Sequence, residues 1–303
     1  MCGIVGLYLK NQALESELGA LFTPMLIEMS DRGPDSAGIA IYQEPVEDDE
    51  TIKLTLFHPD DDFDWEGLKD FLDEELQISA TIDDIASHAV LISDGDPGLL
   101  RQAIEAYDSD LQIMSIGRVI EIYKETGLPA AVAERFDLEA MSGSHIIGHT
   151  RMATESAVTT AGSHPFSTGL DLCLVHNGSL SNHNWLRGEI ERRYGITCRT
   201  ENDTEVAAAY LTAKLLEGRT LHQALDESIL DLDGFYTFCV GTADGFAVLR
   251  DPIACKPAIL AETKDWVAMA SEYRALASLP GVGDAKVWEP EPATVYSWGG
   301  EAA

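Results

Sequence analysis

Basic residues are scarce in this sequence. Lysine and arginine together number 20 against 52 aspartates and glutamates in 303 residues, which gives a formal net charge of −32. Nucleic acids and anionic membranes bind basic protein surfaces, so neither is an expected partner. The acidic residues crowd residues 43–84, where the only lysines are Lys53 and Lys69 and arginine does not occur. This stretch could be a solvated surface, a docking face for a basic partner or an adaptation to high salt.

Cysteines and long apolar runs are also sparse. The five cysteines include no CxxC pair, and their odd number argues against a disulfide framework or a zinc site, so we expect no metal. No apolar run approaches the roughly 18 residues of a transmembrane helix. The N-terminus carries neither the basic nor the apolar region of a secretory signal. These absences predict a reduced, cytoplasmic protein.

Hydrophobic periodicity predicts strands near both ends of the chain and helices grouped between them. The predicted strands are 4–9, 38–42, 51–57, 88–93, 111–117, 145–151, 170–176, 235–241, 245–251, 258–261, 266–270 and 294–298. The predicted helices are 14–29, 65–76, 97–107, 118–125, 182–194, 203–217 and 221–230.

This pattern favours one α+β domain over residues 2–303, with two sheets covered by helices. The strands at 38–42 and 51–57 are expected to pair with each other. The strand–helix alternation over residues 79–140 predicts a small inserted α/β subdomain.

A cysteine at the second position raises a chemical question. Cys2 precedes the apolar run Gly3-Ile4-Val5-Gly6, so it could simply begin a buried strand. Alternatively, removal of Met1 would leave a thiol and a free α-amine on one residue, which pairs a nucleophile with a base. An α-amine has a reference pKa of about 7.7–8.0, which suits proton transfer near neutral pH. Cys2 is therefore the candidate nucleophile.

Two polar clusters follow predicted strands and can complete such a site. Arg151, in the run from Gly148 to Thr154, could be a surface arginine or could bind a carboxylate through two parallel hydrogen bonds. Asn177-Gly178 could form a hairpin turn, but Ser181-Asn182-His183-Asn184 after it is typical of a helix N-terminus. Asn177 and Gly178 could therefore present an amide side chain and a backbone N–H, the donors that an oxyanion hole requires.

Two further clusters extend the candidate site. Asn202 or Asp203 could cap the helix predicted at 203–217, or Asp203 could bind a substrate ammonium group. Ser163-His164-Pro165-Phe166 could be a turn or part of the site. A nucleophile, oxyanion donors, a carboxylate-binding arginine and an ammonium-binding aspartate fit a substrate with an amino-acid head and a distal amide, which is glutamine.

Six motifs occur along the chain in a fixed order. They are Cys2-Gly3-Ile4-Val5-Gly6, Arg32-Gly33-Pro34-Asp35-Ser36-Ala37-Gly38, Gly148-His149-Thr150-Arg151, His164-Pro165-Phe166, His176-Asn177-Gly178 and Asp203-Thr204-Glu205. Motifs and order resemble those of the class II glutamine amidotransferases, which are N-terminal nucleophile (Ntn) hydrolases. The resemblance covers residues 2–42 and about 145–280, and it implies a four-layer αββα sandwich of antiparallel sheets and glutamine hydrolysis through a thioester on Cys2.

The resemblance also implies a role for individual residues. Cys2 would be the nucleophile, and Asn177 with Gly178 the oxyanion hole. The glutamine pocket would be lined by Arg151, Thr154, His164 and Asp203, with Arg32 organising the site. The sequence departs from the common family pattern at Met152, Glu155-Ser156 and Asn202. The loop that closes over glutamine could therefore behave differently and require a partner to order it.

Within the family, the resemblance is most specific to the stand-alone amidotransferase subunit of glutamate synthase-like complexes, of the N-methylglutamate synthase type. The shared stretches are Ala153–Ser167 and Arg250–Pro257. The glutaminase motifs extend to Ser271-Glu272-Tyr273, so we expect the ammonia acceptor on another polypeptide. The resemblance implies a hetero-oligomer with a flavin-bearing synthase subunit and a subunit that resembles the glycine-repeat domain of glutamate synthase.

No cofactor is expected in this chain, because the resemblance implies flavin, with an iron–sulfur cluster as a further candidate, on the partner subunit. Residues 79–140 and the acidic stretch are candidate docking surfaces. Two other functions stay open, a non-catalytic scaffold that uses the sandwich for binding or regulation, and a free-standing glutaminase. The presence of Cys2, Asn177 and Asp203 argues against the scaffold.

Overall fold

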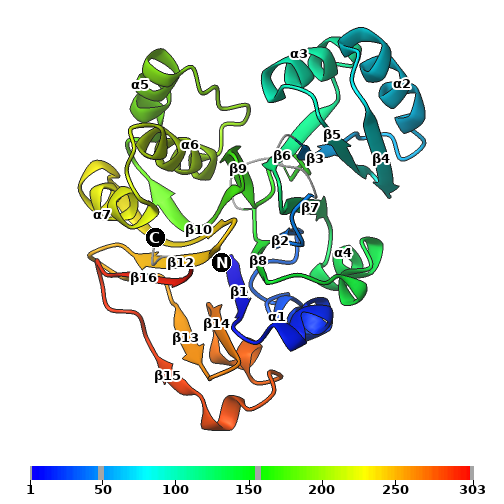
Figure 1. Ribbon diagram of the computed structural model, residues 1–303. Helices are drawn as coiled ribbons and strands as arrows, with labels where there is room; N and C mark the ends of the chain where they lie inside the picture. Colours follow the sequence, from blue (N-terminus) through cyan, green and yellow to red (C-terminus); the bar gives the residue numbers. More distant parts are fainter. Residues whose placement is uncertain (1, 47–50, 154–157, 301–303) are drawn as a thin grey trace.

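Two large sheets lie face to face, and helices cover their outer sides (Figure 1). The structure is a computed structural model that describes residues 2–46, 51–153 and 158–300. Within these ranges the strands form three sheets, and neighbouring strands run antiparallel. The predicted α+β class is confirmed. No helix of the described ranges is long and apolar enough to cross a bilayer.

The first large sheet is built around the N-terminal strand. In spatial order its strands are β15 (Lys286–Trp288), β13 (Ile259–Glu262), β14 (Trp266–Ala270), β1 (Gly3–Leu9), β8 (His145–Arg151), β2 (Ser36–Tyr42) and β7 (Ile120–Thr126). Helices α1 (Leu18–Ile27) and α4 (Pro129–Arg135) cover its outer face, and Phe22, Phe136 and Trp266 belong to the core between them.

Short 3-10 helices accompany this layer. They are η1 (Gln12–Glu17), η2 (Leu138–Ala140), η3 (Tyr273–Leu276) and η4 (Val282–Asp284). The single helix predicted at 14–29 is therefore divided into η1 and α1. The division lies at Glu17, whose φ of −106° and ψ of 2° depart from the values of an α-helix.

The second large sheet carries the strand with Asn177. Its strands are β16 (Val295–Gly299), β12 (Gly245–Arg250), β11 (Gly234–Thr242), β10 (Leu172–Leu180) and β9 (Phe166–Gly169). Helices α5 (His183–Tyr194), α6 (Asp203–Leu216) and α7 (Leu221–Asp231) cover its outer face. Residues 204–213 of α6 are all buried, so α6 is enclosed on every side.

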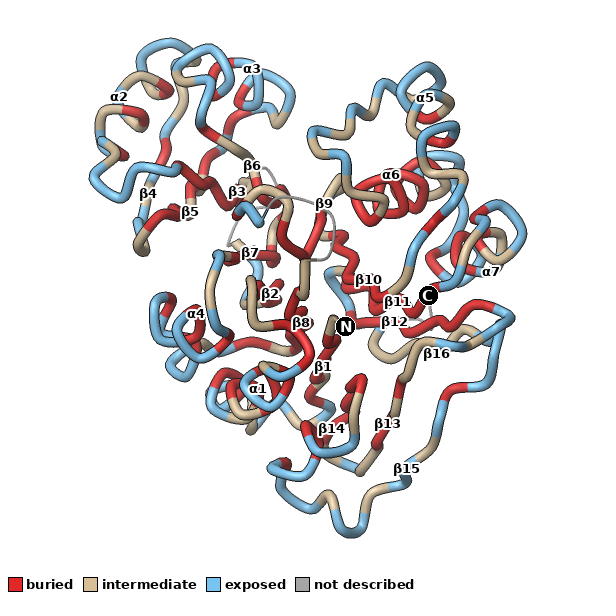
Figure 2. Tube along the Cα trace, turned by 180° about the vertical axis from the view of Figure 1, so that it is seen from behind, coloured by how far each residue is buried: buried red, intermediate tan, exposed pale blue. Residues whose placement is uncertain are grey.

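A separate core fills the space between the two large sheets. Ile4, Ile122 and Ile147 of the first sheet meet Val175 and Phe246 of the second there. Successive side chains of a strand point to opposite faces, so each central strand is buried on both sides. The buried strands run through the middle of the molecule, and the exposed residues lie on the outer helices and loops (Figure 2). The order of layers is helix, sheet, sheet, helix, as the family resemblance implied.

The third sheet belongs to a small unit that stands beside the sandwich. Leu54, Trp65, Leu91 and Leu100 are in a core of its own. Its strands are β4 (Ala80–Ile85), β5 (His88–Ser93), β3 (Ile52–Phe57) and β6 (Gln112–Gly117), and its helices are α2 (Trp65–Leu76) and α3 (Pro97–Tyr107).

The boundaries of this unit differ from the predicted 79–140. The chain leaves the first large sheet at Tyr42 and returns at Ile120, directly opposite in the β2–β7 register. The unit therefore comprises residues 52–117. The prediction missed β3 and α2, which contribute to the core of the unit, and included β7 and α4, which pack in the first sheet layer.

Two further predictions were wrong. The helix expected at 118–125 is strand β7, because Ile120 and Ile122 face the core between the sheets while Tyr123 faces the helices. A short run buried on both faces has no period that separates strand from helix. The strand expected to pair with 38–42 is β3, which instead pairs with β5 and β6.

Polar contacts join the small unit to the sandwich. Lys53 of β3 and Glu121 of β7 form a buried ion pair at 2.8 Å, and the Tyr123 hydroxyl donates to the same carboxylate at 2.7 Å. Directly after the unit, the Asp171 carboxylate accepts hydrogen bonds at 2.9–3.1 Å from the N–H groups of three successive residues, Arg118, Val119 and Ile120. A buried ion pair thus joins the unit to the sandwich, and Asp171 holds the segment by which the chain leaves the unit.

Candidate active site

Cys2 lies at the start of β1, a strand in the middle of the first large sheet. The half-buried Cys2 precedes Gly3, where an added Cβ would lie 2.8 Å from the Met29 Cβ and the Thr150 Oγ1. Only glycine fits that approach. The Ile4 N–H donates to the Ser271 Oγ at 2.9 Å, and the Ser271 N–H donates to the Ile4 carbonyl at 2.9 Å. The segment that carries the candidate nucleophile is therefore fixed immediately after Cys2.

Two side chains from other elements converge on the Cys2 carbonyl oxygen. The Arg32 Nε donates to it at 3.0 Å, and the Asn177 Nδ2 donates to it at 3.2 Å. The Arg32 Nη1 also donates to the Glu272 Oε1 at 2.7 Å. Hydrogen bonding from Arg32, with the charges of Arg274 and Arg32, outweighs burial and lowers the pKa of Glu272. These contacts suit the organising role predicted for Arg32.

Asn177 and Gly178 lie inside β10 and do not form a hairpin turn. They pair with Thr237 and Tyr236 of β11, and the pairing continues to Leu180. A Cβ on Gly178 would lie 2.0 Å from the Phe235 carbonyl oxygen and 2.6 Å from the His176 Nε2. Glycine is therefore required, and it lets β10 pass close to β11 with the Asn177 amide beside Cys2.

Two buried histidines bond to one threonine at the start of α6, and a third histidine stacks on one of them. The Thr204 Oγ1 lies 2.7 Å from the His164 Nε2 and 2.9 Å from the His176 Nδ1. The His149 ring stacks on that of His164 with centroids 4.0 Å apart, and its Nε2 lies 3.1 Å from the His176 carbonyl oxygen.

Burial keeps two of these histidines uncharged. It lowers the pKa of His149 to about 3 and lowers the pKa of His164 well below its ordinary value. Both rings are therefore neutral near pH 7, which suits a rigid hydrogen-bonded support better than acid–base catalysis. The sequence analysis did not single out His149, His176 or Thr204, although each lies within a quoted motif. The feature that could have identified them is a polar residue within an apolar strand or in the first turn of a predicted helix.

Asp203 begins α6 and stays ionised at neutral pH. Its Oδ2 accepts from the Leu180 N–H at 2.9 Å, and its Oδ1 lies 3.6 Å from the His176 Nδ1. Burial acts to raise the pKa of the carboxyl group, but the His176 side chain and the Leu180 N–H outweigh burial and lower it. The helix cap is the neighbouring Asn202, whose Oδ1 accepts from the Thr204 N–H at 2.9 Å. Asp203 is thus an anion available to a substrate ammonium group.

Arg151 ends β8 and is 8% exposed. Its Nη1 donates to the Gly162 carbonyl at 3.2 Å, and the Asn202 Nδ2 donates to the same oxygen at 3.3 Å. Asp35, in the loop that begins at Arg32, makes two hydrogen bonds to the end of β8. Its N–H donates to the Arg151 carbonyl, and its Oδ2 accepts from the Ala153 N–H. Predicted site residue Thr154, with Glu155-Ser156, lies outside the described residues.

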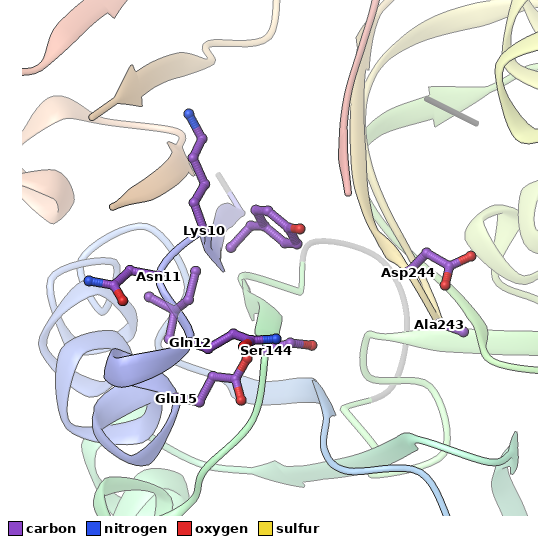
Figure 3. A pocket seen from close by; sticks show the side chains of 9 residues that line it. Lys10, Asn11, Gln12, Glu15, Ser144, Ala243 and Asp244 are labelled. Atoms are coloured by element: carbon purple, nitrogen blue, oxygen red, sulfur yellow. The ribbon is translucent and has the colours of Figure 1, made fainter. Parts of the chain in front are cut away.

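Two cavities lie away from Cys2. One of about 490 Å³ is lined by residues that include Tyr8, Lys10 and Ser144, with Asp244 across the opening (Figure 3). The other is a groove of about 740 Å³ between the small unit and the sandwich. We call it the interunit groove, and its lining includes Arg101, Ser167, Leu170, Arg199 and Leu216.

One group of side chains has the composition of a metal site. Ligand atoms of His58, Asp108 and Asp110 all lie within 4.8 Å of one another. The group belongs to the small unit and includes none of the predicted site residues. Exposed carboxylates often cluster without an ion. This group therefore does not test the prediction that the chain binds no metal.

A cysteine directly before a central strand of an αββα sandwich, with an amide donor beside it, is the arrangement typical of the Ntn-hydrolase fold. Comparisons with known proteins identify the family within this fold. Residues 149–278 match the family described as a glutamine amidotransferase domain. The glutamine amidotransferase-like protein GlxB of Rhizobium meliloti (strain 1021) is 56% identical over 98% of this chain and 98% of its own length. The chain therefore belongs to the class II glutamine amidotransferases.

More distant relatives agree with this family. A putative glutamine amidotransferase of Methanothermobacter thermautotrophicus is 32% identical over 98% of this chain and 99% of its own length. The solved structure of glutamine phosphoribosylpyrophosphate amidotransferase from B. subtilis matches with a TM-score of 0.63 at 21% identity. The match covers 99% of the present chain and 48% of the B. subtilis chain, so the present chain spans about half the length of that protein. At this identity the likeness shows the fold.

Proposed function

We propose that this protein is the glutaminase subunit of a glutamate synthase-like complex of the N-methylglutamate synthase type. It would hydrolyse L-glutamine to glutamate and ammonia and pass the ammonia to a separate synthase subunit. The observation that carries the glutaminase step is the 3.2 Å contact between the Asn177 amide and the Cys2 carbonyl. This contact places a hydrogen-bond donor of β10 at the residue that bears the thiol.

In the first half of the reaction, the Cys2 sulfur attacks the side-chain amide carbon of glutamine. After removal of Met1, the α-amine of Cys2 accepts the thiol proton. The Asn177 amide and the Gly178 N–H bind the oxyanion of the tetrahedral intermediate. The α-ammonium then returns the proton to the leaving nitrogen, the carbon–nitrogen bond breaks, and ammonia leaves behind a thioester.

In the second half, water attacks the thioester carbon while the α-amine accepts a proton from the water. The carbon–sulfur bond breaks, the thiol regains its proton, and glutamate leaves. Arg151 binds the α-carboxylate and Asp203 the α-ammonium of the substrate throughout, while Thr154 and His164 line the pocket. The ionised state of Asp203 supports this assignment.

The partners follow from the motif resemblance. A flavin-bearing synthase subunit, with an iron–sulfur cluster as a further candidate cofactor, would receive the ammonia, and a glycine-repeat subunit would complete a cytoplasmic complex. This chain itself would carry no cofactor. Its docking surface would include the small unit over residues 52–117, which stands beside the sandwich, and the interunit groove between the two.

The test is covalent labelling with the glutamine analogue 6-diazo-5-oxo-L-norleucine. We expect intact mass spectrometry to show a chain without Met1 that gains one adduct, mapped to Cys2, and releases ammonia from glutamine before labelling. Cys2→Ala should gain no adduct and release no ammonia. A chain that retains Met1 and gains no adduct, with or without the synthase subunit, would contradict the proposal and favour the non-catalytic scaffold.

A further inference from the structure

Lys124 is a buried lysine that the sequence analysis did not single out. It lies on β7 and is 3% exposed. Its Nζ donates to three backbone carbonyls, those of Ala161 at 3.2 Å, Ser163 at 2.9 Å and Pro165 at 3.2 Å. An ammonium group has three N–H donors, so these carbonyls use all of them.

The surroundings of this ammonium group are unusual for a buried charge. The Nζ lies 4.6 Å from the centroid of the Phe166 ring, a cation–π contact that stabilises the charged form of the lysine. The charge of Glu205, on α6, acts to raise the pKa of Lys124, but within the described residues the two side chains do not form an ion pair. Burial lowers the pKa of Lys124 to about 7. A lysine that bears this cost without an ion pair has its main partners in the three carbonyls.

The three carbonyls belong to one segment, residues 160–166, which reaches the candidate glutamine site in two places. Its Gly162 carbonyl accepts from both Arg151 and Asn202. Its His164 ring is hydrogen-bonded through Thr204 to the second large sheet. Lys124 contacts the segment from the first large sheet, so the segment is held between the two sheets.

We propose that Lys124 is a positioning residue for the glutamine site, and that its ammonium group holds residues 160–166 where His164 and the carbonyl partner of Arg151 meet the substrate. This inference rests on the proposed glutaminase function. Cys2 contacts Arg32 and Asn177, which lie on other elements, so Lys124 affects recognition of the amino-acid head and leaves the reactivity of the thiol unchanged.

The experiment compares two electrophiles on the same thiol. 6-diazo-5-oxo-L-norleucine requires the glutamine pocket, whereas iodoacetamide is small and lacks the amino-acid head. In Lys124→Met, an apolar side chain of similar length, three carbonyls lose their donor. We expect the rate of Cys2 labelling by the glutamine analogue to fall at least about 10-fold, because small displacements of binding groups are costly. Labelling of Cys2 by iodoacetamide, mapped by peptide mass spectrometry, should keep the wild-type rate.

The matched control is Lys53→Met. Lys53 is also a buried lysine, but its partner is Glu121 and it does not contact residues 160–166. We expect Lys53→Met to lower the melting temperature and to leave the ratio of the two labelling rates unchanged. If Lys124→Met does not fold, Lys124→Arg is measured instead. The planar guanidinium of arginine cannot reproduce the three diverging N–H groups of lysine, so the ratio of labelling by the glutamine analogue to labelling by iodoacetamide should again fall.

The outcomes separate the two proposals. Failure of the glutamine analogue to label wild-type Cys2 would contradict the glutaminase function itself. Normal labelling of the wild type, together with an unchanged ratio in the folded Lys124 variant, would overturn the role of Lys124 and leave the glutaminase function standing. An equal fall of both rates would also overturn it, since a merely structural role predicts that result.

Discussion

At the scale of single residues, Arg32 connects three distant parts of the chain at the candidate nucleophile. Its guanidinium is 8% exposed and bonds to Cys2, 30 positions away, and to Glu272, 240 positions away. A guanidinium can donate in two directions at once with fixed geometry, which a lysine ammonium cannot reproduce. Arg32 therefore helps to hold the Cys2 carbonyl where Asn177 also reaches it.

Replacement of Arg32 by lysine should impair glutamine hydrolysis. Lysine can keep one of the two contacts, and loss of a charged hydrogen bond next to Cys2 should lower kcat/KM about 10- to 100-fold. The matched control is Arg274→Lys, because Arg274 also pairs with Glu272, at 2.8 Å, but has no contact with Cys2. Steady-state assay of ammonia release checks the pair. Equal activities for the two variants would show that Arg32 does not organise the site.

At the scale of elements, β10 depends on a glycine where it passes β11. Gly178→Ala would push a Cβ to 2.0 Å from the Phe235 carbonyl, so the strands must separate beside Asn177. We expect about 2–4 kcal/mol of lost stability in denaturant unfolding, together with loss of ammonia release.

The control for this strand is a glycine in a helix. An added Cβ at Gly188, in α5, meets no atom within 4 Å. Gly188→Ala should therefore leave activity unchanged and raise stability by up to about 1 kcal/mol, because alanine favours helix over glycine. A Gly178→Ala variant as stable and active as Gly188→Ala would contradict the close approach of the two strands.

Strand β7 shows where reasoning from the sequence fails at this scale. The sequence predicts a helix at 118–125 and does not single out Lys124. In the folded protein β7 pairs with β2, and alternation puts Lys124 on the same face as Ile122, toward the second sheet and residues 160–166. The partners of Lys124 lie 37–41 positions away, so no local pattern could reveal them.

At the scale of the whole molecule, Lys124 should make stability depend on pH. Its pKa is about 7 in the folded chain and 10.5 ordinarily, so between these values the unfolded chain binds more protons. Stability therefore rises with pH across this window, by at most about 1.4 kcal/mol per pH unit, as the cost of the buried charge is relieved. Of the groups that act electrostatically on Lys124, Glu205 favours its charge, while burial keeps His88 and His164 neutral.

The measurement is urea unfolding of the wild type and Lys124→Met between pH 7 and pH 10. The wild type should gain stability relative to the variant as pH rises, because the variant has no group that titrates there. Other titrating groups are common to both proteins and cancel in the difference. Parallel stability curves would show that Lys124 titrates alike in the folded and unfolded chains.

The interunit groove should carry the contact with the proposed synthase subunit. Leu216, at the end of α6, lines the groove and is 68% exposed. Leu230, near the end of α7, is 88% exposed and does not line it. We expect Leu216→Glu to lose co-purification with the flavin-bearing subunit, while Leu230→Glu retains it and both keep ammonia release. Retained co-purification of Leu216→Glu would place the docking surface elsewhere.

Much of the candidate site could be predicted because its groups lie in short polar runs next to apolar strands. Cys2 and Asn177 were candidates in this way, since a polar side chain at the end of a buried strand lacks a packing reason. Gly178 was a candidate for its backbone N–H, and Asp203 for its carboxylate at a predicted helix start. Glu272 and Thr204 could not be assigned from sequence. Their importance comes from hydrogen bonds to Arg32 and to His164, which only the folded chain brings within reach.

The amino-acid sequence by itself determined the identity of most strands and helices, the α+β class and the motifs of a class II glutamine amidotransferase. Each of these depends on side-chain patterns over a few successive residues, because the period of the pattern corresponds to the geometry of a strand or a helix. Tertiary structure alone decided that residues 52–117 form a unit inserted between β2 and β7, that 118–125 contains a strand, and that Lys124 supports residues 160–166. These outcomes depend on contacts between segments far apart in the chain, where burial and pairing outweigh local preference.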